Sequence, residues 1–451
     1  MSLELARRAL EAAGGDAEAV VQSERSGFAR FADSEVHQPT LVANTVVQLR
    51  IVVDGSRVGV ASSNRTDDAG LAELAARARE IAESAAPDDA FPGLAEPAAP
   101  REVAGFDEET AALGPEEQAR LAGAAIEARG GLDVYGFFTS GVSELAVAST
   151  TGIAVQQAMT DATVLTLAAG DGASGYATQT SWSVREIDPA AAAREAVAKA
   201  ERTRDAGELE PGRYRAVLEP YAFAELLHYF GFATFNGLAF VEERSFLSGR
   251  LGERVFDPRI SIADDALDPA GLPKAFDFEG TPKERVALVE DGVARGVVWD
   301  RATAAKADGQ RSTGHALNAS MRSYGPYALA LSVAPGEAES TDELAELVGD
   351  GIYITRLHYL GIIQPRDGVI TGMTRDGTFR IRDGKVREPL VNHRFTVSVP
   401  ELLADVPGLT RETTLVNQSD FYDERYPYAA RVPAIATATF NVTGAGSSPG
   451  L

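Results

Sequence analysis

The sequence LEPYAFAELLHYFGFATFNGLAFVEERSFLSGRLGERV, residues 218 to 255, opens the second half of the chain, and its pattern decides the predicted fold. A short strand is predicted to end at Leu218. Pro220 suits the first turn of a helix, because the N–H that proline lacks is not needed there. The helix that follows is apolar except along one line. That line has the i, i+3, i+4 and i+7 spacing of a single helical face and carries Glu225, His228, Tyr229 and Phe232. The sequence therefore predicts a largely apolar helix with one chemically distinct face.

The charge of the chain limits its partners. Its 451 residues include 42 Lys and Arg against 66 Asp and Glu, which gives a formal net charge of -24. Nucleic acids and anionic membranes both favour basic surfaces, so we expect neither as a partner.

The chain contains no cysteine, which excludes disulfides, thiolate metal ligands and thiol nucleophiles and fits a cytoplasmic location. No apolar run approaches the roughly 18 residues that a membrane span needs.

Helical and hairpin patterns along the chain predict an α+β protein. We expect a mixed α/β sandwich region in the N-terminal part, followed by a β-rich C-terminal domain built of hairpins with few helices. In the first part, strands are predicted at 16–23 and 45–53, and helices at 2–13 and 68–86. Asp-Gly pairs are typical of two-residue hairpin turns, because both residues tolerate positive φ. Such pairs occur at 54–55, 291–292 and 383–384.

Changes in composition predict the domain boundaries. Four prolines stand among alanines and acidic residues between positions 87 and 109, which is typical of a linker. An acidic, turn-rich joint near residue 208 marks a second boundary. The predicted order is an N-terminal α+β subdomain at 1–90, a linker at 91–110, a middle α+β subdomain at 111–208, the β-rich C-terminal domain at 209–444 and a disordered tail at 445–451.

The pair Glu225-x-x-His228 raises the question of a metal site. Its spacing puts a carboxylate and an imidazole on one helical face, as in di-metal helix bundles. One such pair supplies two ligands, whereas zinc fills roughly four positions. We therefore favour a solvated acid beside a partly buried histidine. The alternative is a rebuilt metal site in which Glu242 or Glu243 adds a carboxylate.

Six segments, in order along the chain, resemble the TldD/PmbA family. They are RIVVDGSRVGVASSN (50–64), LLHYFGFATFNGLAFVEERSFLSGRLGERV (226–255), FDFEGTPKERVALVEDGV (276–293), RSTGHALN (311–318), TGMTRDGTFRIRDGKV (371–386) and VPAIATATFNVTG (432–444). Each segment alone is a modest match, and the common order makes the set more specific. The resemblance covers nearly the whole chain.

The resemblance implies a subunit of a peptidase. TldD-type members are zinc metallopeptidases with His-Glu-x-x-x-His on the central helix and a distant cysteine ligand. TldE-type (PmbA) members keep the fold, lack these ligands and pair with the catalytic chain, and the pair cleaves unfolded peptides in an enclosed cavity. An ungapped match puts His228 at the first ligand position, Tyr229 in place of the glutamate and Ala233 in place of the second histidine. The resemblance thus implies a TldE-like chain with no catalytic residue or metal of its own, and with zinc in a TldD-like partner.

The same resemblance suggests which residues line the peptide cavity. The possible cavity-lining residues are Phe232, Asn236, His315 and Asn318. For His315 we favour a structural role in ordering its loop. The favoured partners are a TldD-like subunit, as a heterodimer, and an unfolded peptide. Two other functions stay open: a metallopeptidase or hydrolase with a rebuilt site around His228, and a homodimeric peptide-binding protein without a protease partner.

Overall fold

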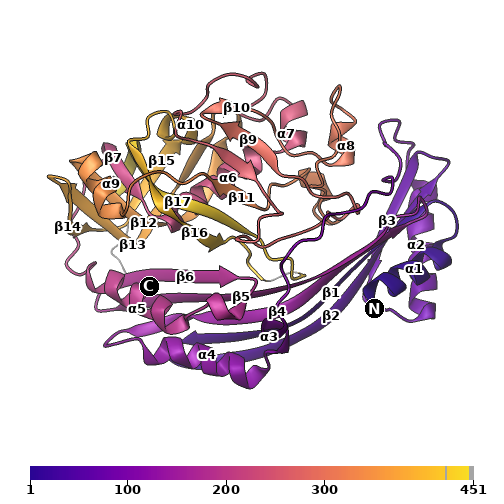
Figure 1. Cartoon of the computed structure of the whole chain (residues 1–451), viewed down its shortest axis with the longest axis horizontal. Helices are drawn as coiled ribbons and strands as arrows, with labels where there is room; N and C mark the ends of the chain where they lie inside the picture. The colour runs from indigo at the N-terminus through magenta and orange to yellow at the C-terminus, as the bar shows by residue number, and fades with distance from the viewer. Residues whose placement is uncertain (422–423, 446–451) are drawn as a thin grey trace.

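The computed structural model describes residues 1–421 and 424–445, and it confirms the predicted α+β fold (Figure 1). The first half of the chain forms a long curved sheet flanked by helices. The second half forms a β-rich unit that lies against this sheet and surrounds helix α6 (Pro220–Thr234). Within the two described ranges, no helix is long and apolar enough to cross a bilayer.

The N-terminal unit is one antiparallel sheet with the strand order β3-β2-β1-β4-β5-β6. Its strands are β1 (Ala17–Ala32), β2 (Glu35–Val53), β3 (Arg57–Ser63), β4 (Asp133–Ser149), β5 (Ala154–Gly170) and β6 (Ala173–Ser181). Its helices are α1 (Ser2–Ala13), α2 (Asp68–Ser84), α3 (Glu108–Ala112), α4 (Pro115–Glu127) and α5 (Pro189–Glu201).

This single sheet joins the two stretches, 1–90 and 111–208, that the sequence divides into separate subdomains. Strand β1 of the first stretch pairs along its length with β4 of the second. The apolar cores nevertheless stay separate. One core forms where α1 and α2 cover one end of the sheet, and the other forms where α4 and α5 cover the other end. The helices that form the two cores are predicted from local sequence pattern. The pairing of β1 with β4 joins residues far apart in the sequence, so local pattern does not predict it.

The β1–β2 hairpin extends well beyond the predicted strands at 16–23 and 45–53. Its ladder runs from the pair Ala17 and Ile51 to the pair Ala32 and Glu35, with the turn at Asp33 and Ser34. We call residues 24–44 the hairpin arm. The pattern misses the arm because the side chains of residues 35–43 are all exposed, so the apolar alternation that marks a half-buried strand is absent there.

The C-terminal unit is an 11-stranded sheet in which five strands close into a ring. The order around the ring is β17-β15-β13-β12-β7, and β7 pairs back with β17. The ring strands are β7 (Gly212–Leu218), β12 (Gly351–Gln364), β13 (Val369–Arg382), β15 (His393–Ser398) and β17 (Ala429–Ala445). The remaining strands are β8 (Ile262–Asp264), β9 (Val286–Glu290), β10 (Val293–Ala294), β11 (Leu331–Val333), β14 (Lys385–Leu390) and β16 (Gly408–Asn417).

Few helices accompany these strands. Besides α6 they are α7 (Gly237–Val241), α8 (Arg301–Ala304), α9 (Thr341–Val348) and α10 (Val399–Leu402).

The three predicted Asp-Gly turns all have positive φ at both residues, for example 47° and 76° at Asp291 and Gly292 between β9 and β10. The predicted tail, 445–451, lies outside the described residues except for Ala445, which ends β17.

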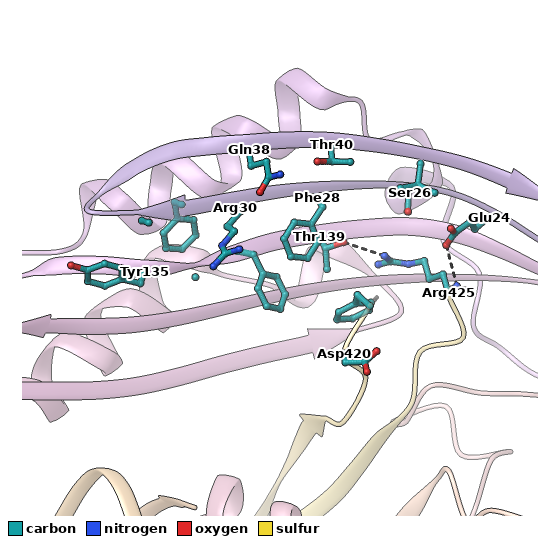
Figure 2. A pocket seen from close by; sticks show the side chains of 16 residues that line it. Glu24, Ser26, Phe28, Arg30, Gln38, Thr40, Tyr135, Thr139, Asp420 and Arg425 are labelled. Atoms are coloured by element: carbon teal, nitrogen blue, oxygen red, sulfur yellow. Dashed lines mark hydrogen bonds between the residues drawn. The ribbon is translucent and has the colours of Figure 1, made fainter. Parts of the chain in front are cut away.

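A buried ion pair ties the two units together. The loop between β16 and β17 crosses to the N-terminal sheet, where Arg425 donates to both carboxylate oxygens of Asp161 on β5, at 2.7 and 2.5 Å. Arg425 also donates to the Thr139 hydroxyl on β4, at 3.1 Å (Figure 2). The Arg425 and Asp161 side chains are 4% and 0% exposed. A bidentate pair of this kind fixes both distance and direction, so it sets the position of the loop on the sheet.

Removing the Arg425 charge should destabilise the fold, because it leaves the Asp161 carboxylate buried without its partner. We expect Arg425→Gln to lower the free energy of unfolding by about 3–5 kcal/mol, as measured by urea denaturation. The matched control is Arg411→Gln, which breaks a pair with Glu339 whose side chains are 63% and 67% exposed. That variant should change stability by less than about 1 kcal/mol. Equal effects from the two variants would contradict the anchoring role of Arg425.

Candidate functional site

Helix α6 has a buried side and an open side. On the buried side, Leu226, Leu227 and Phe230 are at most 1% exposed and pack into the largest core of the C-terminal unit. Glu225, His228, Tyr229, Phe232 and Ala233 are only partly buried. The sequence spacing thus identifies the open side, because the polar and aromatic residues recur with the period of the helix. We call this side the α6 face.

His228 sits at the centre of a group of aromatic rings. Its ring stacks on Tyr428 at 5.9 Å between centroids and meets Tyr229 edge-on at 5.6 Å. The Tyr327 hydroxyl lies 3.0 Å from Nδ1 of His228. Burial lowers the pKa of His228 to about 4, so the imidazole is neutral at neutral pH. A neutral, hydrogen-bonded and ring-packed imidazole has the properties of a packing group.

Glu225 lies next to this aromatic group and faces a cation. Burial raises the pKa of its carboxyl, and the nearby guanidinium of Arg356 on β12 offsets part of that rise. Arg356 itself lies 3.9 Å from the centroid of the Tyr176 ring of β6 and pairs with Asp376 at 2.6 Å. Burial also raises the pKa of Tyr229, and the Glu225 charge adds to the rise. Several neighbouring groups with shifted pKa values in one place make the α6 face the candidate functional site.

The structure buries two of the four residues expected to line a cavity. Asn236 is 4% exposed, accepts the backbone N–H of Leu238 and caps α7, so it has a structural role. His315 is 1% exposed, and its Nε2 lies 2.8 Å from Asp264, whose other oxygen accepts the N–H of Ala330. The helix cap and the buried His–Asp pair account for the positions of these two side chains, and the cavity-lining role of both stays a prediction.

The other two residues are more accessible. Phe232 is partly buried on the α6 face and meets Tyr327 edge-on at 5.4 Å between centroids. Asn318 forms a turn, in which its side-chain oxygen accepts the backbone N–H of Met321 at 3.1 Å. The next residue, Ala319, donates its N–H to Gln48 of β2. Phe232 therefore belongs to the α6 face, whereas Asn318 lies where the C-terminal unit meets the N-terminal sheet.

Sequence reasoning missed the two tyrosines that complete the aromatic group. Tyr327 and Tyr428 come from different loops, about 100 and 200 residues beyond α6, so no local period connects them to His228. A weak signal exists, because each tyrosine directly follows a proline in a loop, as Pro326-Tyr327 and Pro427-Tyr428. Proline restricts the loop backbone and so helps to hold the next ring in place.

The geometry also bears on a rebuilt metal site. In the described ranges, no three His, Cys, Asp or Glu residues are grouped so that they could hold a metal ion. Glu242 hydrogen-bonds Arg244 at 2.8 Å just after α7. Glu225 and His228 are therefore not joined by Glu242 or Glu243 into a ligand set. The α6 face offers ring faces, phenol hydroxyls and one carboxyl, which suit stacking and hydrogen bonding with a ligand.

The lowered pKa of His228 makes the fold sensitive to acid. The unfolded chain binds this proton near the ordinary pKa of 6.5, whereas the folded chain binds it near 4. The His228 contribution is therefore complete above pH 6.5 and is lost as the pH falls toward 4. We expect His228→Gln to reduce the loss of stability between pH 6.5 and 4 by up to about 3 kcal/mol, since one pKa unit is about 1.4 kcal/mol. Urea denaturation at a series of pH values measures this difference. His358, whose pKa is also lowered to about 4, contributes equally in both proteins, so parallel pH curves would contradict the assignment.

Comparison with known proteins gives relatives for both units. The solved structure of TldE from Thermococcus kodakarensis aligns with a TM-score of 0.86 over 98% of this chain and 99% of that one, at 21% identity. A Thermotoga maritima protein named as a candidate modulator of a DNA gyrase aligns with a TM-score of 0.83 over 98% and 99% of the two chains, at 18% identity. At these identities the alignments establish the shared fold.

The matches found by sequence cover a smaller part of the chain than the structural alignments do. A protein named metalloprotease from Methanothermobacter thermautotrophicus is 29% identical over 204 residues, which cover 44% of this chain and 43% of that one. The matched part thus spans less than half the length of this curated relative. The model of the PmbA/TldA metallopeptidase C-terminal domain matches residues 211–444, and that of the PmbA/TldA metallopeptidase domain 1 matches residues 17–82. Because the first match alone covers more than half of the chain, the protein belongs to the PmbA/TldD metallopeptidase family.

Proposed function

We propose that this chain is the non-catalytic, TldE-like subunit of a two-chain zinc metallopeptidase. In this proposal it pairs with a TldD-like subunit that carries the zinc, completes the cavity and helps to hold unfolded peptide for cleavage. It binds no metal of its own, and the complex works in the cytoplasm. The proposal rests on the family membership and on the residues that occupy the α6 face.

The composition of the α6 face is the observation that carries the proposal. The resemblance puts a metal ligand, a general base and a second ligand at positions 228, 229 and 233, and this chain has His228, Tyr229 and Ala233 there. A tyrosine with a raised pKa keeps its proton at neutral pH and cannot act as the base. An alanine has no ligand atom. The hydrogen bond and ring contacts of His228 give its imidazole a packing role, which supports a surface that binds without cleaving.

A reconstitution experiment tests the proposal. The chain alone should leave an unfolded peptide intact, and mixing it with a TldD-like subunit encoded by the same source should give a stable complex that cleaves the peptide. Size-exclusion chromatography measures the complex and a quenched fluorescent peptide measures cleavage. Cleavage by the chain alone would contradict the proposal. A stable homodimer that does not bind the TldD-like chain would favour the alternative function, a homodimeric peptide-binding protein.

A substitution at His228 separates a packing role from a catalytic one. We expect His228→Phe to leave cleavage by the reconstituted complex within about twofold, because the ring contacts with Tyr428 and Tyr229 are kept. A residue that acts in proton transfer typically contributes about 100-fold or more, so a loss of that size would contradict the packing role. Circular dichroism of the variant provides the control that the fold is intact.

A further inference from the structure

The hairpin arm has an uncovered strand edge. Strand β3 pairs with β2 only from Val47 to Val53, so no strand of the described chain lies beside the outer edge of residues 35–46. Positions 36–46 contain no Asp, Glu, Lys or Arg, and Leu41 is 64% exposed. Proteins usually protect such edges with charges or prolines, and here Pro39 is the single proline. An uncharged edge of this length is suited to pair with another strand.

Two cavities flank this edge, one on each face of the sheet. The first, of about 450 Å3, lies on the face turned to the C-terminal unit and includes Gln38, Thr40 and Val42 of β2 (Figure 2). The second, of about 270 Å3, lies on the face covered by α3 and α4 and includes Leu41 and Ala43. Because side chains of an added strand would alternate between the two faces, each face offers space for every second side chain.

The first cavity combines an apolar wall with the cation Arg30, and the carboxylates of Glu24 and Asp420 line it as well. Phe28 stacks on Phe137 at 4.8 Å between ring centroids, and Phe137 meets Phe421 edge-on at 6.1 Å. Arg30 lies on β1 directly opposite Gln38 of β2 and is exposed. Within the described residues, the Arg30 guanidinium makes no ion pair and no hydrogen bond. The cavity thus offers a carboxylate a cationic partner next to a place for a large apolar side chain.

We propose that residues 35–46 of β2 bind the C-terminal segment of an extended peptide by antiparallel strand addition, with the terminal carboxylate on Arg30. The direction follows from the strand: the free edge of β2 begins at Glu35 beside the hairpin turn, so an antiparallel strand ends near Gln38, which lies opposite Arg30. An apolar side chain of the peptide packs on Phe28, Phe137 and Phe421. This inference deepens the proposed function and rests on it, since unfolded peptide is the substrate proposed for the complex.

A second copy of the chain fits the same edge less well. Paired about a twofold axis, it would bring the short side chains of Thr40, Leu41, Val42 and Ala43 to the edge. Residues 35–46 contain no Phe, Tyr or Trp, so the copy would bring no large aromatic side chain to the cavities of about 450 and 270 Å3 and would add two cavities of its own. It would also bring no carboxyl terminus to Arg30. A peptide with large side chains and a free C-terminus satisfies both features.

Peptide binding to the isolated chain tests the inference. The probe is an extended nonapeptide, Gly-Ser-Val-Thr-Phe-Thr-Val-Thr-Phe, with fluorescein at its N-terminus and a free C-terminal carboxylate, and fluorescence anisotropy measures its affinity. We expect Arg30→Gln to weaken binding about tenfold, and amidation of the C-terminus to weaken binding to the unchanged protein by a similar factor. Amidation should have no effect on the Arg30→Gln protein, since the two changes remove the same interaction. The matched control, Arg101→Gln, removes an exposed arginine that lines neither cavity and should bind like the unchanged protein.

A second variant tests the strand edge. Leu41→Lys puts a charge on the edge and should abolish binding, while hydrogen exchange of residues 35–46 should slow when the peptide binds the unchanged protein. Equal affinity for the free and amidated peptides would overturn the role of Arg30. If the peptide does not bind, and the chain forms a homodimer that Leu41→Lys dissociates, the occupant of this edge is a second copy of the chain and the peptide proposal is wrong. The binding assay needs no partner subunit. Its result can therefore be interpreted even if reconstitution of the peptidase fails.

Discussion

The ion pair between Arg425 and Asp161 is the constraint on which the rest of the structure depends. It is buried, bidentate and made between the loop before β17 and strand β5 of the other unit. The same loop carries Phe421 into the cavity on the hairpin arm and Tyr428 onto the ring of His228. One fixed guanidinium therefore positions a side chain at each of the two proposed binding surfaces, four residues before it and three residues after it.

The α6 face shows how a helix can keep its place in the fold whatever side chains stand on its open side. The helix is held by its buried side, whose leucines and phenylalanines pack into the core regardless of what stands on the open side. The open side is then free to carry metal ligands or aromatic rings without loss of the helix. In this chain the rings of Tyr229, Tyr327 and Tyr428 surround His228, and burial keeps its imidazole neutral. Family membership alone therefore does not establish catalysis, which depends on these few side chains.

The sequence predicts those features that depend on local pattern. Helix α6 and its face follow from apolar periodicity, and the Asp-Gly turns follow from the freedom of both residues at positive φ. The features it misses depend on long-range contacts. The exposed arm residues 35–43 carry no apolar alternation, and Tyr327 and Tyr428 reach His228 only through the folding of distant loops. A structural role for His315 is favoured from its segment, but its buried partner, Asp264, lies 51 residues away and no local pattern identifies it.

The measurement that tests the central claim most directly is the zinc content of the purified chain. The chain is incubated with excess zinc, passed through a desalting column and analysed by inductively coupled plasma mass spectrometry. The account predicts far less than one zinc ion per chain, because among the described residues His228 belongs to no group of three possible metal ligands and the sequence has no cysteine. One tightly held zinc ion per chain, lost on His228→Phe substitution, would contradict the account and identify the α6 face as a metal centre.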